Sequence, residues 1–211
     1  MKRYELINLL IKENKYKTYL EIGVYVGNNI KEIVCEIKDS VDPYITDDFD
    51  LLPKKYEYPV KYRVTSDDFF ENIAPTLDYK YDIIFIDGLH LTEQVDKDIE
   101  NSLKYLNENG TIVLHDCNPD SYDLQIVPRV YEYWSGNVWK SVVKIRHRGD
   151  LDVFVIDSDT GLGVITKKTP VENTKMLEKE LEWEYFDKNR KSLLCLISET
   201  DFLLKTYKNR F

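Results

Sequence analysis

Two of the three histidines in this chain stand beside aspartates at the ends of short apolar runs. Asp87-Gly88-Leu89-His90 follows the run Ile83–Ile86, and His115-Asp116 follows the run from Thr111 to Leu114. Carboxylate oxygens bind cations such as Mg²⁺, and an imidazole can take up a proton near neutral pH. If the two runs are neighbouring strands, these residues predict acid–base chemistry beside a bound divalent cation.

A structural explanation of the same residues stays open. Asp87 and Asp116 can cap the helices that follow them, and His90 can be a satisfied turn residue. The placement of two of only three histidines beside two strand-terminal aspartates favours a functional site. We interpret His147, which lies farther along the chain, as structural.

A glycine-containing segment, Glu21-Ile22-Gly23-Val24-Tyr25-Val26-Gly27, follows the first apolar run. Glycines allow a tight turn and a close approach of the backbone to a ligand, although a packing glycine in any strand-to-helix turn has the same appearance. The segment lacks the third glycine of a dinucleotide fingerprint, so a nucleoside without phosphates is favoured. Asp42, at the end of the second run, is placed to bind ribose hydroxyls.

Short apolar strands alternate with helical stretches, which predicts a doubly wound α/β fold with a mostly parallel sheet. Strands are expected to end near Ile22, Val41, Val64, Ile86 and Leu114. Helical stretches are expected at residues 2–14, through Ile30, Ile33, Val34 and Ile37, and from Thr92 to Leu106. Residues 141–146 and 151–156 are predicted to pair as an antiparallel hairpin, which brings the sheet to seven strands.

The length of 211 residues suits one domain, here residues 1–168, with a helical extension over residues 169–211. Apolar residues of the extension need a surface to cover, either on the domain or on a second subunit, which makes a homodimer an expectation. They are Leu181, Trp183, Leu193, Leu194, Leu196 and Ile197.

The formal net charge of −9 argues against a nucleic-acid partner and suits a small ligand with a positive centre. No apolar run approaches the length of a membrane span, so no membrane association is expected. The three cysteines show no metal-ligand spacing, and a reduced, cytoplasmic location is the expectation.

Several segments together resemble class I S-adenosylmethionine-dependent methyltransferases, and more narrowly the macrolide-sugar O-methyltransferases, as a small single-domain branch. The resemblance covers about residues 16–167. Its segments are 21–27, Val41-Asp42-Pro43, Ser66 to Phe70, Phe85 to His90 and Gly110 to Asp116. It implies a Rossmann-like methyltransferase fold.

The resemblance also implies roles for individual residues. Asp87 and Asp116 match metal ligands of that group, and His90 matches its general base. Position 115 is acidic in the macrolide enzymes and is His115 here, a neutral nitrogen ligand that lowers the charge of the site. Glu21, Gly23 and Gly27 would surround the methionine part of the cofactor, Asp42 the ribose, and Ser66 and Asp67 the adenine edge. Asp87 is also expected to bind the cofactor.

The acceptor is expected to bind after the fifth strand, where two further segments resemble a small branch of the family. Trp134 and Trp139 can stack on a sugar ring, and Arg129 or Lys140 can reach a charged group. Packing of these aromatic residues in the core is an equally open explanation.

The expected reaction is transfer of a methyl group from S-adenosylmethionine to an acceptor oxygen, with His90 as base, Asp87 as a further catalytic residue and Mg²⁺ or another divalent cation assisting. A sugar hydroxyl of a glycan or glycosylated metabolite is the preferred acceptor. The alternatives are a nicotinamide oxidoreductase on a similar sheet and a non-catalytic subunit that has kept the fold.

Overall fold

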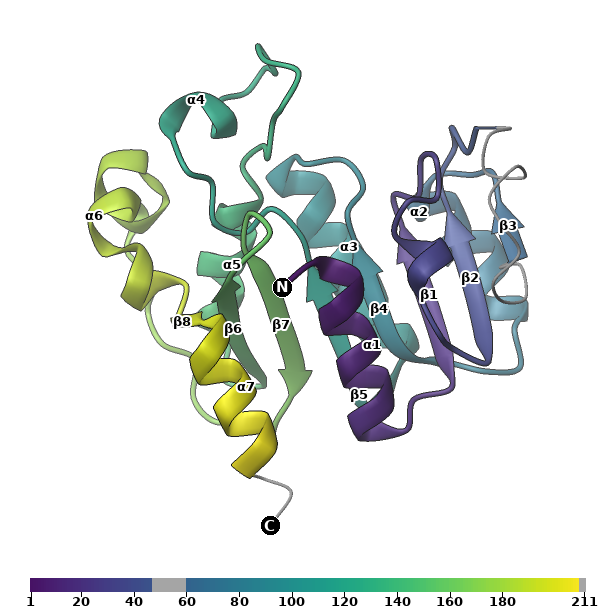
Figure 1. Ribbon diagram of the computed structural model, residues 1–211. Coiled ribbons are helices and arrows are strands. Elements are labelled where there is room, and N and C mark those ends of the chain that lie inside the picture. Colours follow the sequence, from purple (N-terminus) through teal and green to yellow (C-terminus); the bar gives the residue numbers. More distant parts are fainter. Residues whose placement is uncertain (47–59, 209–211) are drawn as a thin grey trace. The chain divides into compact units, whose positions relative to one another are not determined.

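The computed structural model describes residues 1–46 and 60–208 (Figure 1). Its contacts divide the chain into two compact units. The N-terminal unit comprises Lys2–Leu89 and Glu93–Val113, and the C-terminal unit comprises Met1, His90–Thr92 and Leu114–Phe211. The predicted boundary between residues 168 and 169 stays a prediction, and the tail beyond it belongs to the C-terminal unit.

The N-terminal unit is built on a sheet with the strand order β3-β2-β1-β4-β5. The strands are β1 (Thr18–Ile22), β2 (Ile37–Val41), β3 (Val60–Tyr62), β4 (Tyr81–Ile86) and β5 (Leu106–Leu114). Strand β1 pairs in parallel with both β2 and β4, and β2 pairs in parallel with β3. The predicted mostly parallel sheet is confirmed, and so are the strand ends, except that β3 ends at Tyr62 and not at Val64.

Continuous burial explains why these runs form inner strands. Every residue of β1 is buried, and Ile83 to Ile86 of β4 are at most 1% exposed. Parallel strands covered on both faces have this apolar character. Helices α1 (Arg3–Asn14) and α3 (Thr92–Tyr105) supply further buried side chains, among them Leu6, Ile7 and Ile99.

The helical stretch expected from Ile30 to Ile37 is wrong. The structure has only a 3₁₀ turn, η1 (Ile30–Glu32), and β2 already begins at Ile37. The side chain of Asn8 donates to the carbonyl of Glu32 and accepts from the amide of Val34, at 2.8 and 2.9 Å. These bonds from α1 satisfy backbone groups that a longer helix would have paired internally.

Short helical elements connect β3 to β4. They are α2 (Ser66–Asp68), η3 (Phe69–Ile73) and η4 (Ala74–Thr76). The hydroxyl of Thr65 accepts from the amide of Asp68 and caps the first of them. This cap fixes the start of α2, where Ser66 and Asp67 lie.

The C-terminal unit contains an antiparallel hairpin, but only one of its two strands lies in a segment that was predicted to form it. Strands β6 (Leu151–Asp157) and β7 (Leu162–Lys167) pair in antiparallel register, whereas residues 141–146 belong to helix α5 (Val138–Arg146). Helical geometry brings Val138, Val142 and Ile145 of α5 onto one buried face, since they are four and three residues apart. The predicted first strand of the hairpin is therefore wrong.

The remaining elements of this unit are α4 (Tyr122–Gln125), η5 (Glu178–Leu181), α6 (Trp183–Leu193), β8 (Leu196–Ser198) and α7 (Glu199–Lys208). Strand β8 pairs in parallel with β6, and neither β7 nor β8 was predicted from the sequence. Phe186 of α6 stacks on Trp139, with ring centroids 4.0 Å apart. The tail thus packs on its own unit.

Within the part of the chain that the structure describes, no helix has the length and apolar character needed to cross a membrane.

Candidate functional site

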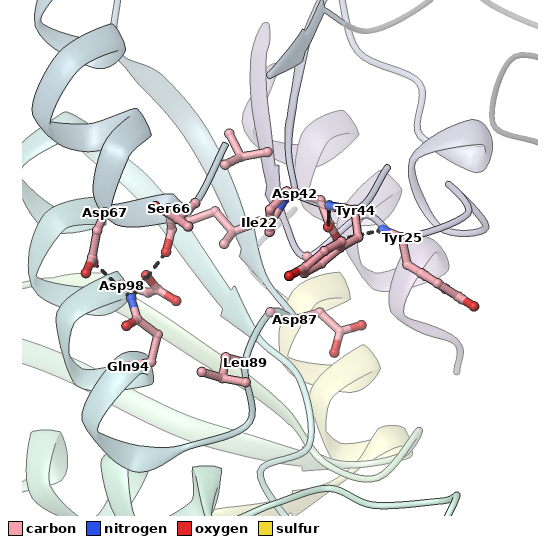
Figure 2. Close-up of a pocket in the computed structure, with 15 residues that line it drawn as sticks. Ile22, Tyr25, Asp42, Tyr44, Ser66, Asp67, Asp87, Leu89, Gln94 and Asp98 are labelled. Carbon is pink, nitrogen blue, oxygen red and sulfur yellow. Dashed lines mark hydrogen bonds between the residues drawn. The ribbon is translucent and has the colours of Figure 1, made fainter. Parts of the chain in front are cut away.

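A cavity of about 460 Å³ opens in the N-terminal unit, at the carboxyl ends of its parallel strands (Figure 2). Four aspartates line it, and no Lys or Arg does among the described lining residues. The acidic members are Asp42, Asp67, Asp87 and Asp98. Ligands of doubly wound sheets bind in this position, and this lining favours a ligand without negatively charged phosphates.

Gly23 brings the loop after β1 against the end of β4. Its φ is +87°, and a Cβ at this position would lie 2.1 Å from the carbonyl oxygen of Asp87. Any side chain would force the two segments apart. The predicted need for glycine is confirmed at this residue, and it arises from the approach of two backbones beneath the cavity.

Asp42, the residue predicted to bind ribose, follows the last residue of β2 and lies two positions before the exposed Tyr44. Its two carboxylate oxygens accept from the backbone amides of Tyr25 and Tyr44, at 2.8 and 2.7 Å. These two hydrogen bonds fix the orientation of the carboxylate at the cavity wall (Figure 2). The remaining lone pairs can accept from vicinal hydroxyls.

Ser66, Asp67, Gln94 and Asp98 form one hydrogen-bonded group at the other side of the cavity (Figure 2). The Nε2 of Gln94 donates to Ser66 Oγ, Asp67 Oδ1 and Asp98 Oδ1, at 3.2, 3.0 and 3.1 Å. Lys97 pairs with the other oxygen of Asp67 at 3.1 Å. A set of carboxylates and an amide at a cavity edge can bind the donors and acceptors of a purine.

The two aspartates of this group differ in protonation. Hydrogen bonds from Gln94 and Lys97 lower the pKa of Asp67 below its usual value. Burial raises the pKa of Asp98 to about 6, against the opposing hydrogen bonds from Ser66 and Gln94. Asp67 is therefore ionised at neutral pH, while Asp98 changes its charge within the physiological range.

Asp87 follows the last residue of β4 and lines the cavity, with a side chain only 15% exposed. Its Oδ2 lies 2.6 Å from Nη1 of Arg3, the first residue of α1. The pair joins residues 84 positions apart in the sequence. Arg3 was not predicted from the sequence as part of this site.

Glu21 is buried in β1 and is not among the residues that line the cavity. Its carboxylate accepts from the hydroxyl of Tyr19 and, at 2.8 Å, from Nδ2 of Asn29. Burial is the largest cause that raises the pKa of Glu21 to about 7. Gly27 has a φ of +75° and lies in the turn after β1, also outside the cavity lining.

His90 belongs to the C-terminal unit, where its ring is held on two sides. Its Nδ1 lies 3.1 Å from the carbonyl oxygen of Trp134 and 3.4 Å from Oδ2 of Asp116. The rings of His90 and Trp134 stack, with centroids 5.7 Å apart. Gly136, at φ +62°, permits this approach, since a Cβ there would lie 1.9 Å from the carbonyl oxygen of His90.

Asp116 and His115 are both about 5% exposed and contact each other. His115 Nδ1 lies 3.2 Å from Asp116 Oδ2, and its Nε2 lies 3.2 Å from Thr160 Oγ1. Thr160 also donates to Asp116 Oδ1 at 2.8 Å. In this structure His115 and Thr160 position the Asp116 carboxylate, which is 3.4 Å from His90.

The four residues predicted for the acceptor lie in different surroundings. Trp134 stacks on His90 and donates through Nε1 to the carbonyl of Ile126 at 2.7 Å. Trp139 is fully buried, which gives it a packing role, and Lys140 Nζ lies 5.5 Å from its ring centroid. Arg129 donates to backbone carbonyls in its own loop, including that of Tyr131 at 2.8 Å.

A second cavity, of about 500 Å³, opens in the C-terminal unit. It is lined by two aromatic residues, Tyr122 and Trp183, and by the exposed carboxylates of Glu182 and Glu184. The rings of Tyr122 and Trp183 meet edge to face, with centroids 6.0 Å apart. Aromatic faces beside carboxylates suit a ligand with a C–H face and several hydroxyl groups.

Sequence reasoning missed several residues that line the first cavity. Tyr44 is adjacent to the Asp42-Pro43 pair, and an aromatic residue so close to a predicted ribose ligand was an available signal. Gln94 and Asp98 are four residues apart on α3, a spacing that puts both on one helix face. Leu89, 55% exposed, lies between the two predicted site residues Asp87 and His90.

Comparison with known proteins gives a match to one family model. Residues 20–117 match the model of a family described as a methyltransferase domain. Among the curated proteins, none matches this sequence.

Solved structures share the fold at low sequence identity. The S-adenosylhomocysteine-bound methyltransferase PaMTH1 of Podospora anserina is 18% identical, with a TM-score of 0.61 over 79% of this chain and 78% of that one. An O-methyltransferase of Bacillus cereus in complex with S-adenosylhomocysteine is 12% identical, with a TM-score of 0.58 over 79% and 80%. TomG of Streptomyces achromogenes, an O-methyltransferase of tomaymycin synthesis solved with S-adenosylmethionine, is 14% identical, with a TM-score of 0.52 over 79% and 80%.

Proposed function

We propose that this chain, an S-adenosylmethionine-dependent methyltransferase by its domain and its fold, transfers the methyl group to a hydroxyl oxygen of a small polar acceptor. The observation that carries the proposal is the acidic lining of the first cavity. Four aspartates and no Lys or Arg among its described lining residues suit a sulfonium nucleoside. The pyrophosphate of a nicotinamide cofactor would meet repulsion there, which disfavours an oxidoreductase.

The lining also suits the parts of the cofactor. Asp42, held by two backbone amides, would accept from the ribose hydroxyls. Ser66, Asp67 and Asp98 would take the adenine edge, with Asp98 accepting from the exocyclic amino group. Glu21, Gly23 and Gly27 would shape the methionine end from beneath, although only Gly23 lines the cavity itself.

The cofactor supplies an activated methyl group, and the protein has to orient the acceptor and remove its proton. We propose His90 as the base. Its Nδ1 donates to the carbonyl oxygen of Trp134 and lies 3.4 Å from a carboxylate oxygen of Asp116. This arrangement makes Nε2 the atom that takes up the acceptor proton, and Asp116 stabilises the imidazolium that forms.

A divalent cation, Mg²⁺ or a similar ion, would be held by Asp87 and Asp116, with His115 as a further predicted ligand. The donor set of two carboxylates fits such an ion. The two aspartates follow β4 and β5, which are neighbours in the sheet. A cation there would lower the pKa of the acceptor hydroxyl. Both ring nitrogens of His115 lie close to protein groups, which supports a positioning role for His115 instead.

We propose a sugar hydroxyl of a glycan or glycosylated metabolite as the acceptor. The second cavity, with Tyr122, Trp183 and two glutamates, supports this class. Trp134, stacked beside His90, is the predicted acceptor residue that fits best, while Arg129 and Lys140 stay predictions. Homodimer formation, a cytoplasmic location and the absence of a nucleic-acid partner also stay predictions.

Two measurements test the proposal. Calorimetry with S-adenosylhomocysteine and NAD should give saturable binding of the first only, and D42N should weaken that binding. Transfer of labelled methyl groups to methyl glycosides and to catechol then identifies the acceptor class. Binding of NAD but not S-adenosylhomocysteine would overturn the methyltransferase function, and labelling of catechol alone would overturn the sugar acceptor.

A further inference from the structure

Asp116 has a backbone conformation that needs support from its surroundings. Its φ is +59°, in the left-handed region, which is unfavourable for a residue with a side chain. Such a conformation persists only where neighbouring contacts hold it. The carboxylate that it directs lies 3.4 Å from Nδ1 of His90. Either task proposed for Asp116, stabilising the imidazolium or holding a cation, requires the carboxylate to stay in this position.

The turn between β6 and β7 holds one side of the segment that follows Asp116. The amide of Cys117 donates to the carbonyl of Gly161 at 3.1 Å. The amide of Asn118 donates to the carbonyl of Thr160 at 2.8 Å. Thr160 itself has a φ of +62°, and its hydroxyl donates to Asp116. Two segments with left-handed residues thus hold each other, so loosening one of them would release the other.

Arg190 of α6 holds the other side of this segment. Its Nη1 donates to Oδ1 of Asn118 at 2.7 Å and to the carbonyl oxygen of Pro119 at 3.0 Å. Asn118 is only 7% exposed, and its side-chain nitrogen donates to Asp157 at 3.0 Å. Without the guanidinium, two acceptors of buried residues would lose their donor, a costly loss that favours rearrangement of the segment.

The guanidinium of Arg190 is itself fixed in place. It lies over the rings of Trp183 and Phe186, 5.7 and 5.2 Å from their centroids, and it pairs with Asp187 one turn earlier in α6. A planar guanidinium can stack and donate from several nitrogens at the same time, which an ammonium group cannot. Arg190 lies outside residues 20–117, which match the family model.

We infer that Arg190 is a positioning residue for methyl transfer, which acts through Asn118 on the carboxylate of Asp116. It holds the segment after Asp116 in place, so that the left-handed backbone persists and the carboxylate stays directed at His90. The helical tail thereby takes part in the geometry of the proposed base. This inference rests on the proposed function, in which His90 takes up the acceptor proton.

Steady-state kinetics test the inference with labelled S-adenosylmethionine and the methyl glycoside or catechol that accepts the label. We expect R190Q to lower kcat about 10- to 100-fold, the usual effect of losing a residue that orients a functional side chain. Calorimetry with S-adenosylhomocysteine should give an unchanged dissociation constant, because residues of the N-terminal unit line the first cavity. R190K keeps the charge but loses the planar donor set, so its kcat should fall between the two.

R146Q is the matched control. Arg146 of α5 belongs to the same unit and also donates to a backbone carbonyl, that of Val153. Its replacement removes an arginine–carbonyl hydrogen bond away from Asp116, so it should lower stability and leave kcat nearly unchanged. Equal losses of kcat in R190Q and R146Q would make general destabilisation the cause and would overturn the inference.

Histidine signals report the position of Asp116 without any activity. The chain has three histidines, so nitrogen NMR of a histidine-labelled sample gives few ring signals, and H90A identifies those of His90. At one fixed pH, R190Q should shift the signals of His90 and His115, whose Nδ1 atoms lie 3.4 and 3.2 Å from Asp116. The signals of His147, which has other partners, should stay in place.

N118A tests the path of the effect, because it removes the side-chain acceptor of Arg190. If Arg190 acts through this contact, the losses in kcat should not multiply, and the double variant should lose about as much as the stronger single variant. Losses that multiply would mean that Arg190 acts elsewhere, against the inference.

The outcomes also separate this inference from the proposed function. Full kcat or unshifted His90 signals in R190Q, or in R190K where R190Q does not fold, would overturn the role of Arg190 alone. If the unaltered protein transfers no methyl group to either acceptor, the proposed function fails. The histidine signals then still decide whether Arg190 positions Asp116.

Discussion

The Nδ1 atom of His90 lies 3.1 Å from the backbone carbonyl oxygen of Trp134. A carbonyl oxygen can only accept, so this contact requires a proton on Nδ1 and leaves Nε2 with the lone pair of a base. The same segment fixes the ring by stacking Trp134 against it. The tautomer and the orientation of the proposed base are therefore set by one short loop.

Replacement of His90 by alanine should lower turnover by about 10²-fold or more, because the acceptor proton loses its base. Binding of S-adenosylhomocysteine should stay intact, since the first cavity is lined by residues of the N-terminal unit. H147Q is the matched control, because His147 bonds Thr174 and Glu180 and has no proposed catalytic role. Unchanged turnover in H90A would remove His90 from the mechanism.

Gly136→Ala should displace His90 without touching the first cavity. A Cβ at residue 136 would lie 1.9 Å from the carbonyl oxygen of His90, and the φ of +62° is costly for alanine. We expect a lower kcat with little change in the affinity for S-adenosylhomocysteine. Gly23→Ala provides the contrast, since it should weaken cofactor binding. A G136A enzyme with normal kcat would show that the loop does not control His90.

The sequence predicted the parts of the fold that depend on local patterns. The buried runs of β1 and β4 are continuous and apolar, and Gly23, Asp42 and Asp87 follow strand ends directly. Residues 141–146 form a short apolar stretch, which fits the side-chain period of a strand as well as that of a helix. The helix α5 found there depends on tertiary packing, which the local pattern does not contain.

Contacts between distant residues set the limit of the sequence analysis. The pairing of Arg3 with Asp87 spans 84 positions, and nothing local in the sequence indicates it. Asp98 and Gln94 reach the cavity because of the rotation of α3, which a helical pattern does not fix. The burial of Trp139 likewise depends on Phe186 in the tail, 47 residues farther along the chain.

Glu21→Gln should change how stability depends on pH. Burial raises the pKa of Glu21 to about 7 in the folded protein, so the folded state holds a proton that the unfolded chain releases near its ordinary pKa of 4.5. Stability should therefore fall as pH rises from about 4.5 to 7, by about 3 kcal/mol. Urea unfolding between pH 5 and 8 measures this slope, which E21Q should flatten. An equal slope in both proteins would contradict the assignment to Glu21.

Chelation should switch the activity off if Asp87 and Asp116 hold a cation, and added Mg²⁺ or Mn²⁺ should restore it. D116N should raise the metal concentration needed for half-maximal activity by about tenfold or more, since it removes one charged ligand. T160V tests whether the orientation of the Asp116 carboxylate matters, because it keeps that carboxylate but removes the 2.8 Å hydrogen bond that Thr160 donates to it. If exhaustive chelation leaves the rate unchanged, the two aspartates have another role.

Cofactor binding should strengthen as pH rises through about 6. Burial raises the pKa of Asp98 to about 6, and its ionised form accepts a stronger hydrogen bond from the amino group of adenine than its protonated form does. The affinity for S-adenosylhomocysteine should therefore increase about tenfold between pH 5 and 7, as the ionised fraction of one group rises by that factor.

Two aspartate variants separate Asp98 from its neighbour in this measurement. D98N should remove the pH dependence, because the amide does not titrate. D67N should weaken binding equally at each pH, since the lowered pKa of Asp67 keeps it ionised throughout. A pH dependence that persists in D98N would place the titrating group elsewhere and exclude Asp98 as the residue that binds the adenine amino group.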